Sequence, residues 1–308
     1  MKHFINLKDI PAKDLRKIIV DAQKRKRLRK KLNTLEVDRG APLKGKLLIQ
    51  MFEKSSLRTR LSFYLAIKQL GGGTLTLRSN ELHLGQGGES IADTAKILST
   101  YGDGFMLRTD SDKKIENFKN HLTIPVINGL SPSSHPTQVL SDVFTVEEIK
   151  KKPISKLNIC WIGDSNNVLD SLIAASVKFS FQLSIGCPKK FEPSRKVREW
   201  VKKNNRKIFI YNDATKAVKG ADVIFSDKVI SLNDKVNKKK KTEQFKRFKI
   251  DKKLMKLSNN AIFLHCLPRG NEVSNEVFLG KKSYVWQQAL NRVHVQKSIL
   301  LYSFGKLR

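Results

Sequence analysis

Several features that mark other protein classes are scarce or missing in this chain of 308 residues. It holds three cysteines, Cys160, Cys187 and Cys266, and no CxxC pair. This pattern argues against zinc ribbons and disulfide scaffolds and fits a reduced, cytoplasmic setting. No apolar run approaches the roughly 20 residues of a membrane span. The opening residues lack the apolar core of a signal peptide, so we expect neither a membrane protein nor a secreted one.

Acidic residues are also scarce, since 28 Asp and Glu stand against 60 Lys and Arg, for a formal net charge of +32. The excess is mostly lysine, with 44 Lys against 16 Arg. Proteins that read nucleic acids usually combine arginine with aromatic residues in a defined motif, and none is present. The charge therefore indicates a solvated, lysine-rich surface, densest over residues 235–253, with at most non-specific affinity for nucleic acid.

Apolar runs of strand length alternate with amphipathic helical patterns along the whole chain. This alternation predicts an α/β protein with parallel sheets, and the length suits about two domains. A boundary is expected in the KKPISK segment near residues 150–156. The predicted strands are 47–52, 104–107, 157–162, 183–186, 208–211, 223–226 and 262–265. The predicted helices are 57–70, 91–101, 137–151, 168–179 and 287–304.

Polar motifs follow the predicted strands, where open α/β sheets bind ligands. In FEKSSLRTR, residues 52–60, Ser56 stands where a strand gives way to a helix. Free N–H groups at a helix start bind phosphate, and Arg58 and Thr59 add further donors. In SSHPTQ, residues 133–138, His135 precedes the proline that begins a helix and is able to donate to a carbonyl oxygen.

Two further motifs belong to the second half of the chain. GDSNNVLDSL, residues 163–172, is a glycine turn with Asn166 and Asn167, and it lacks the GxGxxG spacing of dinucleotide sites. It suits a ligand with a carboxylate or an amide. HCLPR, residues 265–269, ends a strand, and the residues alone leave Cys266 open as a nucleophile, a ligand contact or an inert thiol.

These motifs occur in the order and spacing found in one enzyme family. FEKSSLRTRLSF, ESIADTAKILSTYGDGFMLRT, HPTQVLSD, GDSNNVLDSL, HCLPR and QQALNRVHVQK together resemble the carbamoyltransferases, and the ornithine branch in particular. The resemblance covers essentially the whole chain. Aspartate carbamoyltransferases instead carry FEP in the first motif and HPLPR in place of HCLPR.

The resemblance implies two doubly wound parallel-sheet domains joined by helices, with the active site between them. It places a carbamoyl-phosphate domain at residues 1–150, an ornithine domain at 151–290 and a final helix, 291–308, that packs back on the first domain. It also implies a homotrimer, or a multiple of trimers, whose sites borrow a loop from the neighbouring subunit.

Residue by residue, the resemblance assigns two substrate sites. Carbamoyl phosphate would be held by Ser56, Leu57, Arg58, Thr59, His83, Arg108, His135, Gln138, Cys266, Leu267 and Arg292. Ornithine would be held by Asn167, Asp227, Ser231 and Leu232. The catalytic residues would be Arg108, His135 and Cys266, and the Leu267–Pro268 bond would be cis.

The sequence departs from the family pattern at three places. Leu57 stands where the family usually has Thr, and Leu232-Asn233 replaces the usual Met-Gly after Ser231. The neighbour-facing loop HLGQGGES has an extra residue, with His83 where Gln is common. These changes bear on affinity more than on reaction type.

The implied reaction is attack of the ornithine δ-amine on carbamoyl phosphate, which gives citrulline and phosphate and needs no metal or other cofactor. It corresponds to a step of arginine biosynthesis, although the sequence leaves the direction of flux open. Two alternatives also stay open: a carbamoyltransferase for another amino acid such as aspartate, and a catalytically weakened relative that binds polyanions. The lysine-rich segment 235–253 is expected to form a mobile lid whose lysines are individually dispensable.

Overall fold

The computed structural model describes residues 1–78, 88–204, 207–230 and 237–307. By its internal contacts the chain divides into two compact units, one of Met1–Phe144 with Leu290–Arg308 and one of Thr145–Ala289. Each unit is built around one parallel sheet, so the predicted α/β fold with two parallel-sheet domains is confirmed.

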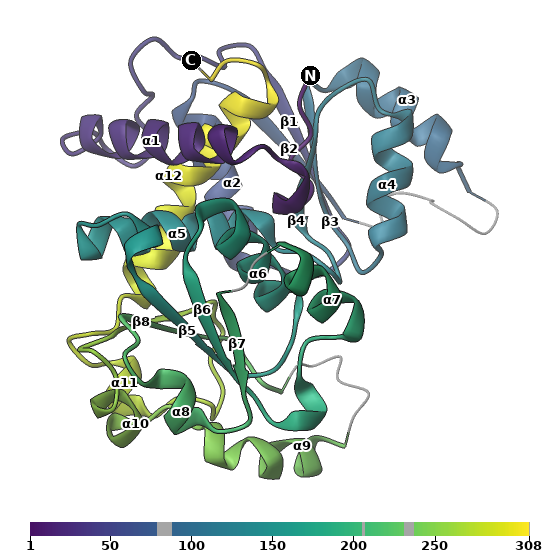
Figure 1. Cartoon of the computed structure of the whole chain (residues 1–308). Helices are drawn as coiled ribbons and strands as arrows, with labels where there is room; N and C mark the ends of the chain where they lie inside the picture. The colour runs from purple at the N-terminus through teal and green to yellow at the C-terminus, as the bar shows by residue number, and fades with distance from the viewer. Residues whose placement is uncertain (79–87, 205–206, 231–236, 308) are drawn as a thin grey trace. The chain divides into compact units, whose positions relative to one another are not determined.

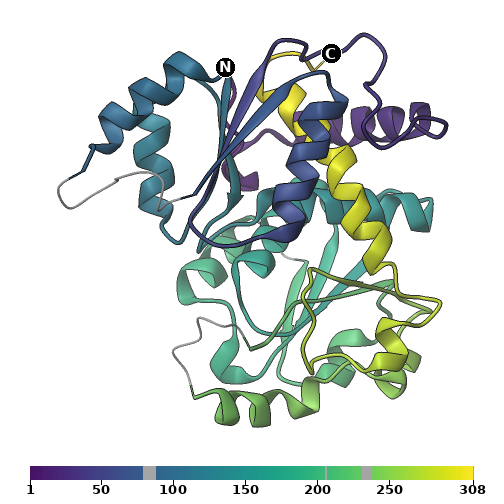
Figure 2. The same cartoon turned by 180° about the vertical axis from the view of Figure 1, so that it is seen from behind.

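The first unit has a four-stranded sheet in the order β2-β1-β3-β4. Helices α3 and α4 cover one face of this sheet, and α2 and α12 cover the other (Figures 1 and 2). The elements of this unit are α1 (Ala12–Leu28), β1 (Leu47–Phe52), α2 (Leu57–Gln69), β2 (Gly73–Arg78), α3 (Ile91–Tyr101), β3 (Gly104–Arg108), α4 (Asp112–His121), β4 (Val126–Leu130), and most of α5 (Pro136–Lys150) and α12 (Val285–Ser303).

The second unit has a five-stranded sheet in the order β7-β6-β5-β8-β9, with every pair parallel. Its core joins the sheet to α8 and to the segment after α9, through apolar residues such as Ile224, Phe263 and Phe248. Its elements are β5 (Asn158–Ile162), α6 (Asn167–Phe179), β6 (Gln182–Gly186), α7 (Arg195–Asn204), β7 (Ile208–Tyr211), α8 (Ala214–Val218), β8 (Val223–Ser226), α9 (Lys238–Phe245), α10 (Lys252–Lys256), β9 (Ile262–His265) and α11 (Asn275–Phe278).

The strand order of each sheet contains a point where the winding reverses. In the first unit this point lies between β1 and β3, and in the second unit it lies between β5 and β8. Connections that leave the strands on opposite sides of such a point open a crevice at the carboxyl ends of the strands, where ligands bind. The loops after these four strands are therefore the places to look for a site.

The described part of the lysine-rich segment, from residue 237 onward, is largely helical. It holds helix α9, a short 3-10 turn at Lys246–Phe248 and the start of helix α10. Lys241, Phe245 and Phe248 are buried while their neighbours are exposed. This spacing of four and three residues is that of an amphipathic helix, whose buried face offsets the repulsion between its lysines.

Candidate functional site

The first group of candidate residues stands at the start of α2. The Ser56 hydroxyl accepts a hydrogen bond from the Thr59 N–H at 3.4 Å and so caps the helix. Leu57 is the first residue of the helix and its side chain is 71% exposed. The following Arg58 is half-buried, whereas Arg60 is exposed. The turn after β1 thus leads into a capped helix whose first turn carries the half-buried Arg58.

Arg292 of α12 joins this helix start to α5. Its Nη2 donates to the Thr59 hydroxyl at 2.9 Å and its Nη1 donates to the Gln138 side-chain oxygen at 2.8 Å. The Gln138 amide nitrogen donates in turn to Asp142 at 2.8 Å, which fixes the orientation of the amide. Thr59, Gln138 and Asp142 are each at most 2% exposed, so this chain of hydrogen bonds is buried and holds the guanidinium in place.

Positive charge dominates this part of the first unit. Burial lowers the pKa of Arg108 to about 10, and the nearby charge of Arg58 adds to the shift. Burial also holds the pKa of His135 well below its usual 6.5, helped by the charges of Arg292, Arg108 and Arg58. His135 is therefore a neutral imidazole at physiological pH, surrounded by three guanidinium groups.

Such a cluster fits an anionic ligand. Gathering three cations costs free energy through mutual repulsion and desolvation, and a bound dianion such as a phosphate ester offsets both. Hydrogen bonds join Arg292 to Thr59 and Gln138. The charges of Arg58, Arg108 and Arg292 all act on His135 and help to lower its pKa. The predicted site residue His83 lies outside the described residues.

In the second unit the turn after β5 meets the loop after β8. The Asn166 side-chain oxygen caps α6 by accepting from the N–H groups of Val168 and Leu169 at 3.0 and 3.1 Å. Its amide nitrogen donates to the Asp227 carboxylate at 2.8 Å. Asn167, the predicted ligand, is the first residue of α6 and is half-buried. The structure thus adds Asn166 as the residue that fixes Asp227, a role that sequence analysis missed.

Asp227 is half-buried, and its carboxylate accepts hydrogen bonds from Asn166 and the Lys228 N–H. Burial raises its pKa, against the opposing influence of His265, the Lys228 N–H and Asn166. Because the raised pKa means that the surroundings disfavour the charged form, a cationic ligand group would stabilise this carboxylate. Ser231 and Leu232, the other predicted ornithine contacts, lie outside the described residues.

The HCLPR motif forms the end of β9 and the turn after it. The Leu267–Pro268 peptide bond is cis, as predicted, and Leu267 has a φ of +59°. The Leu267 N–H donates to Nδ1 of His265 at 2.9 Å, while Nε2 of His265 lies 3.1 Å from a Glu272 oxygen. Because Nδ1 accepts, the proton is on Nε2 and points to Glu272. Cys266 is half-buried between these residues.

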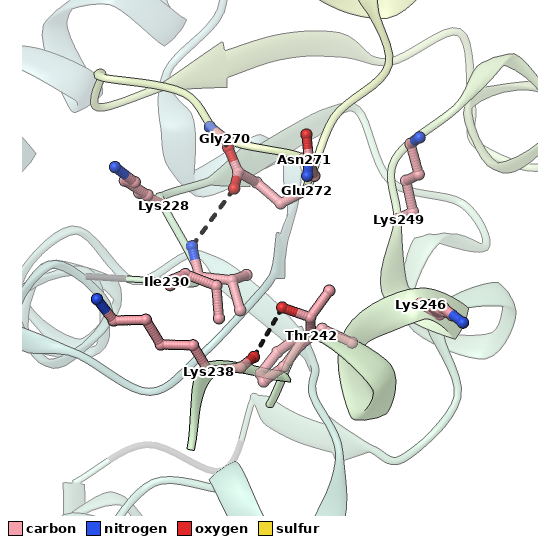
Figure 3. A pocket seen from close by; sticks show the side chains of 11 residues that line it. Lys228, Ile230, Lys238, Thr242, Lys246, Lys249, Gly270, Asn271 and Glu272 are labelled. Atoms are coloured by element: carbon pink, nitrogen blue, oxygen red, sulfur yellow. Dashed lines mark hydrogen bonds between the residues drawn. The ribbon is translucent and has the colours of Figure 1, made fainter. Parts of the chain in front are cut away.

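Glu272 ties this turn to the loop after β8. Burial alone would raise its pKa, but hydrogen bonds from His265 and the Gly270 N–H outweigh burial and lower it. Its second oxygen accepts a hydrogen bond from the Val229 N–H at 3.4 Å. Beside Glu272 is a cavity of about 530 Å³, shown from close by in Figure 3. Its walls are Lys228, Val229, Ile230, Lys238, Thr242, Phe245, Lys246, Lys249, Gly270, Asn271 and Glu272.

Two further observations bear on the class of protein. Among the described residues no cluster of three or more His, Cys, Asp or Glu side chains is arranged to hold a metal ion. None of the helices in the described ranges combines the length and apolar character that a membrane crossing requires.

Comparison with known proteins decides the family. The carbamoyl-P binding domain of aspartate/ornithine carbamoyltransferase matches residues 2–148, and the Asp/Orn binding domain matches residues 155–303. The chain belongs to the aspartate/ornithine carbamoyltransferase family. The two matches leave residues 149–154 between them.

Individual relatives match over their full lengths. An ornithine carbamoyltransferase of Agrobacterium fabrum is 41% identical over 307 residues, which are 99% of this chain and 98% of the relative. The crystal structure of an anabolic ornithine carbamoyltransferase from Campylobacter jejuni has a TM-score of 0.88 at 36% identity, with 99% of this chain and 100% of that chain covered. Ornithine carbamoyltransferase from Pyrococcus furiosus has a TM-score of 0.90 at 36% identity, with coverages of 99% and 97%.

Proposed function

We propose that this chain transfers the carbamoyl group of carbamoyl phosphate to the δ-amine of L-ornithine, giving L-citrulline and phosphate. The observation that carries this proposal is the cluster of Arg58, Arg108 and Arg292 around a neutral His135. Two matched family domains and relatives named ornithine carbamoyltransferase support the substrates.

The cluster provides two kinds of stabilisation for the transfer. Arg58 and Arg292, with the Ser56 hydroxyl, bind the phosphate and neutralise it as it leaves, and Thr59 lies at the carbonyl group. His135, with its pKa held down, stays neutral and donates a hydrogen bond to the carbonyl oxygen, where negative charge develops. Arg108 is the cationic donor to the same oxygen.

The reaction forms one bond and breaks another. The δ-nitrogen bonds to the carbonyl carbon, the carbon–oxygen bond to phosphate breaks, and the attacking nitrogen passes a proton to the departing phosphate. The amine must be neutral to attack, although a free alkylamine titrates near ~10.4. Enclosure near guanidinium groups lowers that pKa and increases the neutral fraction.

The second unit selects the amino acid. Asp227, half-buried and held by Asn166, is the partner of the α-ammonium group, and Asn167 binds beside it. Cys266 and Leu267 line the end of β9, and we assign Cys266 a contact with substrate rather than a covalent role. The domain assignment follows: residues 1–150 bind carbamoyl phosphate, 151–290 bind ornithine, and 291–308 return to the first domain.

We further propose a cytoplasmic homotrimer. An apolar stripe on α2 supports assembly, because Leu57, Leu61 and Tyr64 lie one turn apart and are 71%, 51% and 38% exposed. A symmetric partner would cover this stripe. Light scattering on the purified chain measures the assembly, and a monomeric mass for the active enzyme would contradict it.

A citrulline assay with ornithine and with aspartate as alternative amines tests the reaction. We expect citrulline from ornithine and no carbamoyl aspartate. Product from aspartate alone would show a carbamoyltransferase for another amino acid. If neither product forms and the protein binds DNA with a steep salt dependence, it is instead a polyanion-binding relative.

A further inference from the structure

Lys241 differs from the lysines beside it in the sequence. Lys238, Lys239 and Lys240 are exposed, whereas Lys241 is 3% exposed. It occupies the buried face of α9 together with Phe245. A lysine on the apolar face of a helix pays a desolvation cost, so its partners are the place to look for its role.

The ammonium group of Lys241 reaches the turn between β5 and α6. Its Nζ lies 2.5 Å from the Asp164 carboxylate. It also lies over the Phe191 ring, 5.4 Å from the centroid, and that ring packs against Phe245 at 5.0 Å. An ion pair and a cation–π contact, both largely shielded from water, therefore fix this side chain.

Asp164 opens the turn that carries the asparagines. The Asp164 carbonyl oxygen accepts from the Trp161 indole N–H at 3.2 Å, and the Ser165 hydroxyl donates to the Phe191 carbonyl at 2.6 Å. Asn166 then caps α6 and holds Asp227. Each residue from Asp164 to Asn166 thus has a defined partner, and Lys241 is the charged partner at the start of the turn.

We propose that Lys241 is a positioning residue for the amino-acid substrate. Through Asp164 it holds the turn that places Asn166, Asn167 and, by way of Asn166, the Asp227 carboxylate. The proposal rests on the proposed function, because it assigns these residues to ornithine. It makes Lys241 the exception among the lysines of its segment, which otherwise form a solvated face.

The test compares variants of the full-length enzyme by steady-state citrulline formation. Lys241→Met removes the charge and keeps most of the volume, and Lys240→Met is the matched control on the exposed face. We expect Lys241→Met to raise the ornithine KM about tenfold or more, with the carbamoyl phosphate KM changed less than about twofold. Lys241→Arg should retain the ornithine KM within about threefold, and Lys240→Met should match the wild type.

A second variant guards against misfolding caused by an unpaired Asp164. Asp164→Asn combined with Lys241→Met removes both charges, so no buried ion is left uncompensated. Its ornithine KM should be no higher than that of Lys241→Met or of Asp164→Asn alone, because the same interaction is lost in all three variants. A wild-type ornithine KM in Lys241→Met, or an equal rise in both KM values, would overturn the proposal. Absence of citrulline from the wild type would instead contradict the proposed function itself.

Discussion

Arg292 donates from Nη2 to the Thr59 hydroxyl at 2.9 Å, although 233 residues separate the two in the sequence. The bond joins the last helix to the first turn of α2, and Gln138 of α5 completes it. Three helices therefore converge on one guanidinium group. The geometry of the arginine cluster depends on this convergence as well as on charge.

Arg292→Lys tests geometry against charge. Lysine keeps the positive charge but lacks the planar fork that reaches Thr59 and Gln138 together. We expect kcat/KM for carbamoyl phosphate to fall by about 10- to 100-fold, or roughly 1.4–2.7 kcal/mol. Initial rates at low carbamoyl phosphate measure it. Unchanged kcat/KM would show that charge alone suffices at this position.

Arg58→Ala removes a cation that approaches both Arg108 and His135 electrostatically. Loss of a charge-assisted partner of a dianion should cost several kcal/mol of transition-state stabilisation, on the order of 100-fold or more in kcat. Arg60→Ala is the matched control, since Arg60 follows two residues later and is exposed. Near-normal turnover of Arg58→Ala at saturating carbamoyl phosphate would contradict the assignment.

Much of the fold follows from local patterns. The apolar runs at 47–52 and 262–265 predict β1 and β9 exactly at their observed bounds, because a buried parallel strand is apolar on both faces. Strands β2 and β4 were not predicted, since GTLTLR and VINGL carry Gly, Thr and Asn that weaken the apolar signal. Their places depend on pairing with β1 and β3, which is a non-local property.

The candidate site was predicted mainly through the resemblance, and the structure adds the supporting residues. Asn166 holds Asp227 across 61 positions of sequence, whereas His265 and Glu272 hold the β9 turn through local hydrogen bonds. The sequence predicts Lys241 to be one of many solvated lysines in a mobile segment. The signal that distinguishes it was present, because Lys241, Phe245 and Phe248 follow helical spacing. Counting the charges of the segment as a whole does not show this periodicity, because it treats all the lysines alike.

Asp227→Asn keeps the shape of the side chain and removes its charge. We expect the ornithine KM to rise about tenfold or more and kcat to fall, because the α-ammonium loses its counter-ion. Equilibrium affinity for carbamoyl phosphate alone should change less than about twofold, since the arginine cluster belongs to the first unit. An equal loss of affinity for both ligands would argue against separate substrate sites.

The same variant has a second readout in stability. Burial raises the pKa of Asp227, so the folded state disfavours its charged form. Replacing the carboxylate with a neutral amide should therefore leave the free energy of unfolding at pH 7 unchanged or higher. Urea unfolding measures it. A clear loss of stability would show that the Asp227 charge supports the fold rather than the substrate.

Two buried histidines should make the protein less stable in mild acid. Burial is the main cause that lowers the pKa of His294 to about 3, and the Lys297 charge adds to it. His135 is shifted in the same direction. Below about pH 6.5 the unfolded chain takes up protons at these residues while the folded protein does not, so stability falls as the pH decreases. Above that pH the folded and unfolded states bind the same number of protons at these histidines, so their contribution to stability is constant.

The size of the effect follows from the linkage relation. Between pH 7.5 and 5.5 each such histidine should lower the free energy of unfolding by about 1.4 kcal/mol. Urea unfolding at the two pH values measures the loss, and the window lies above the range in which carboxylates with lowered pKa, such as Asp103 and Glu272, take up protons. In His294→Gln the loss should shrink by about 1.4 kcal/mol, because one of the titrating groups is gone. If the variant and the wild type lose the same stability over this window, His294 is protonated in the folded protein and its surroundings do not exclude charge.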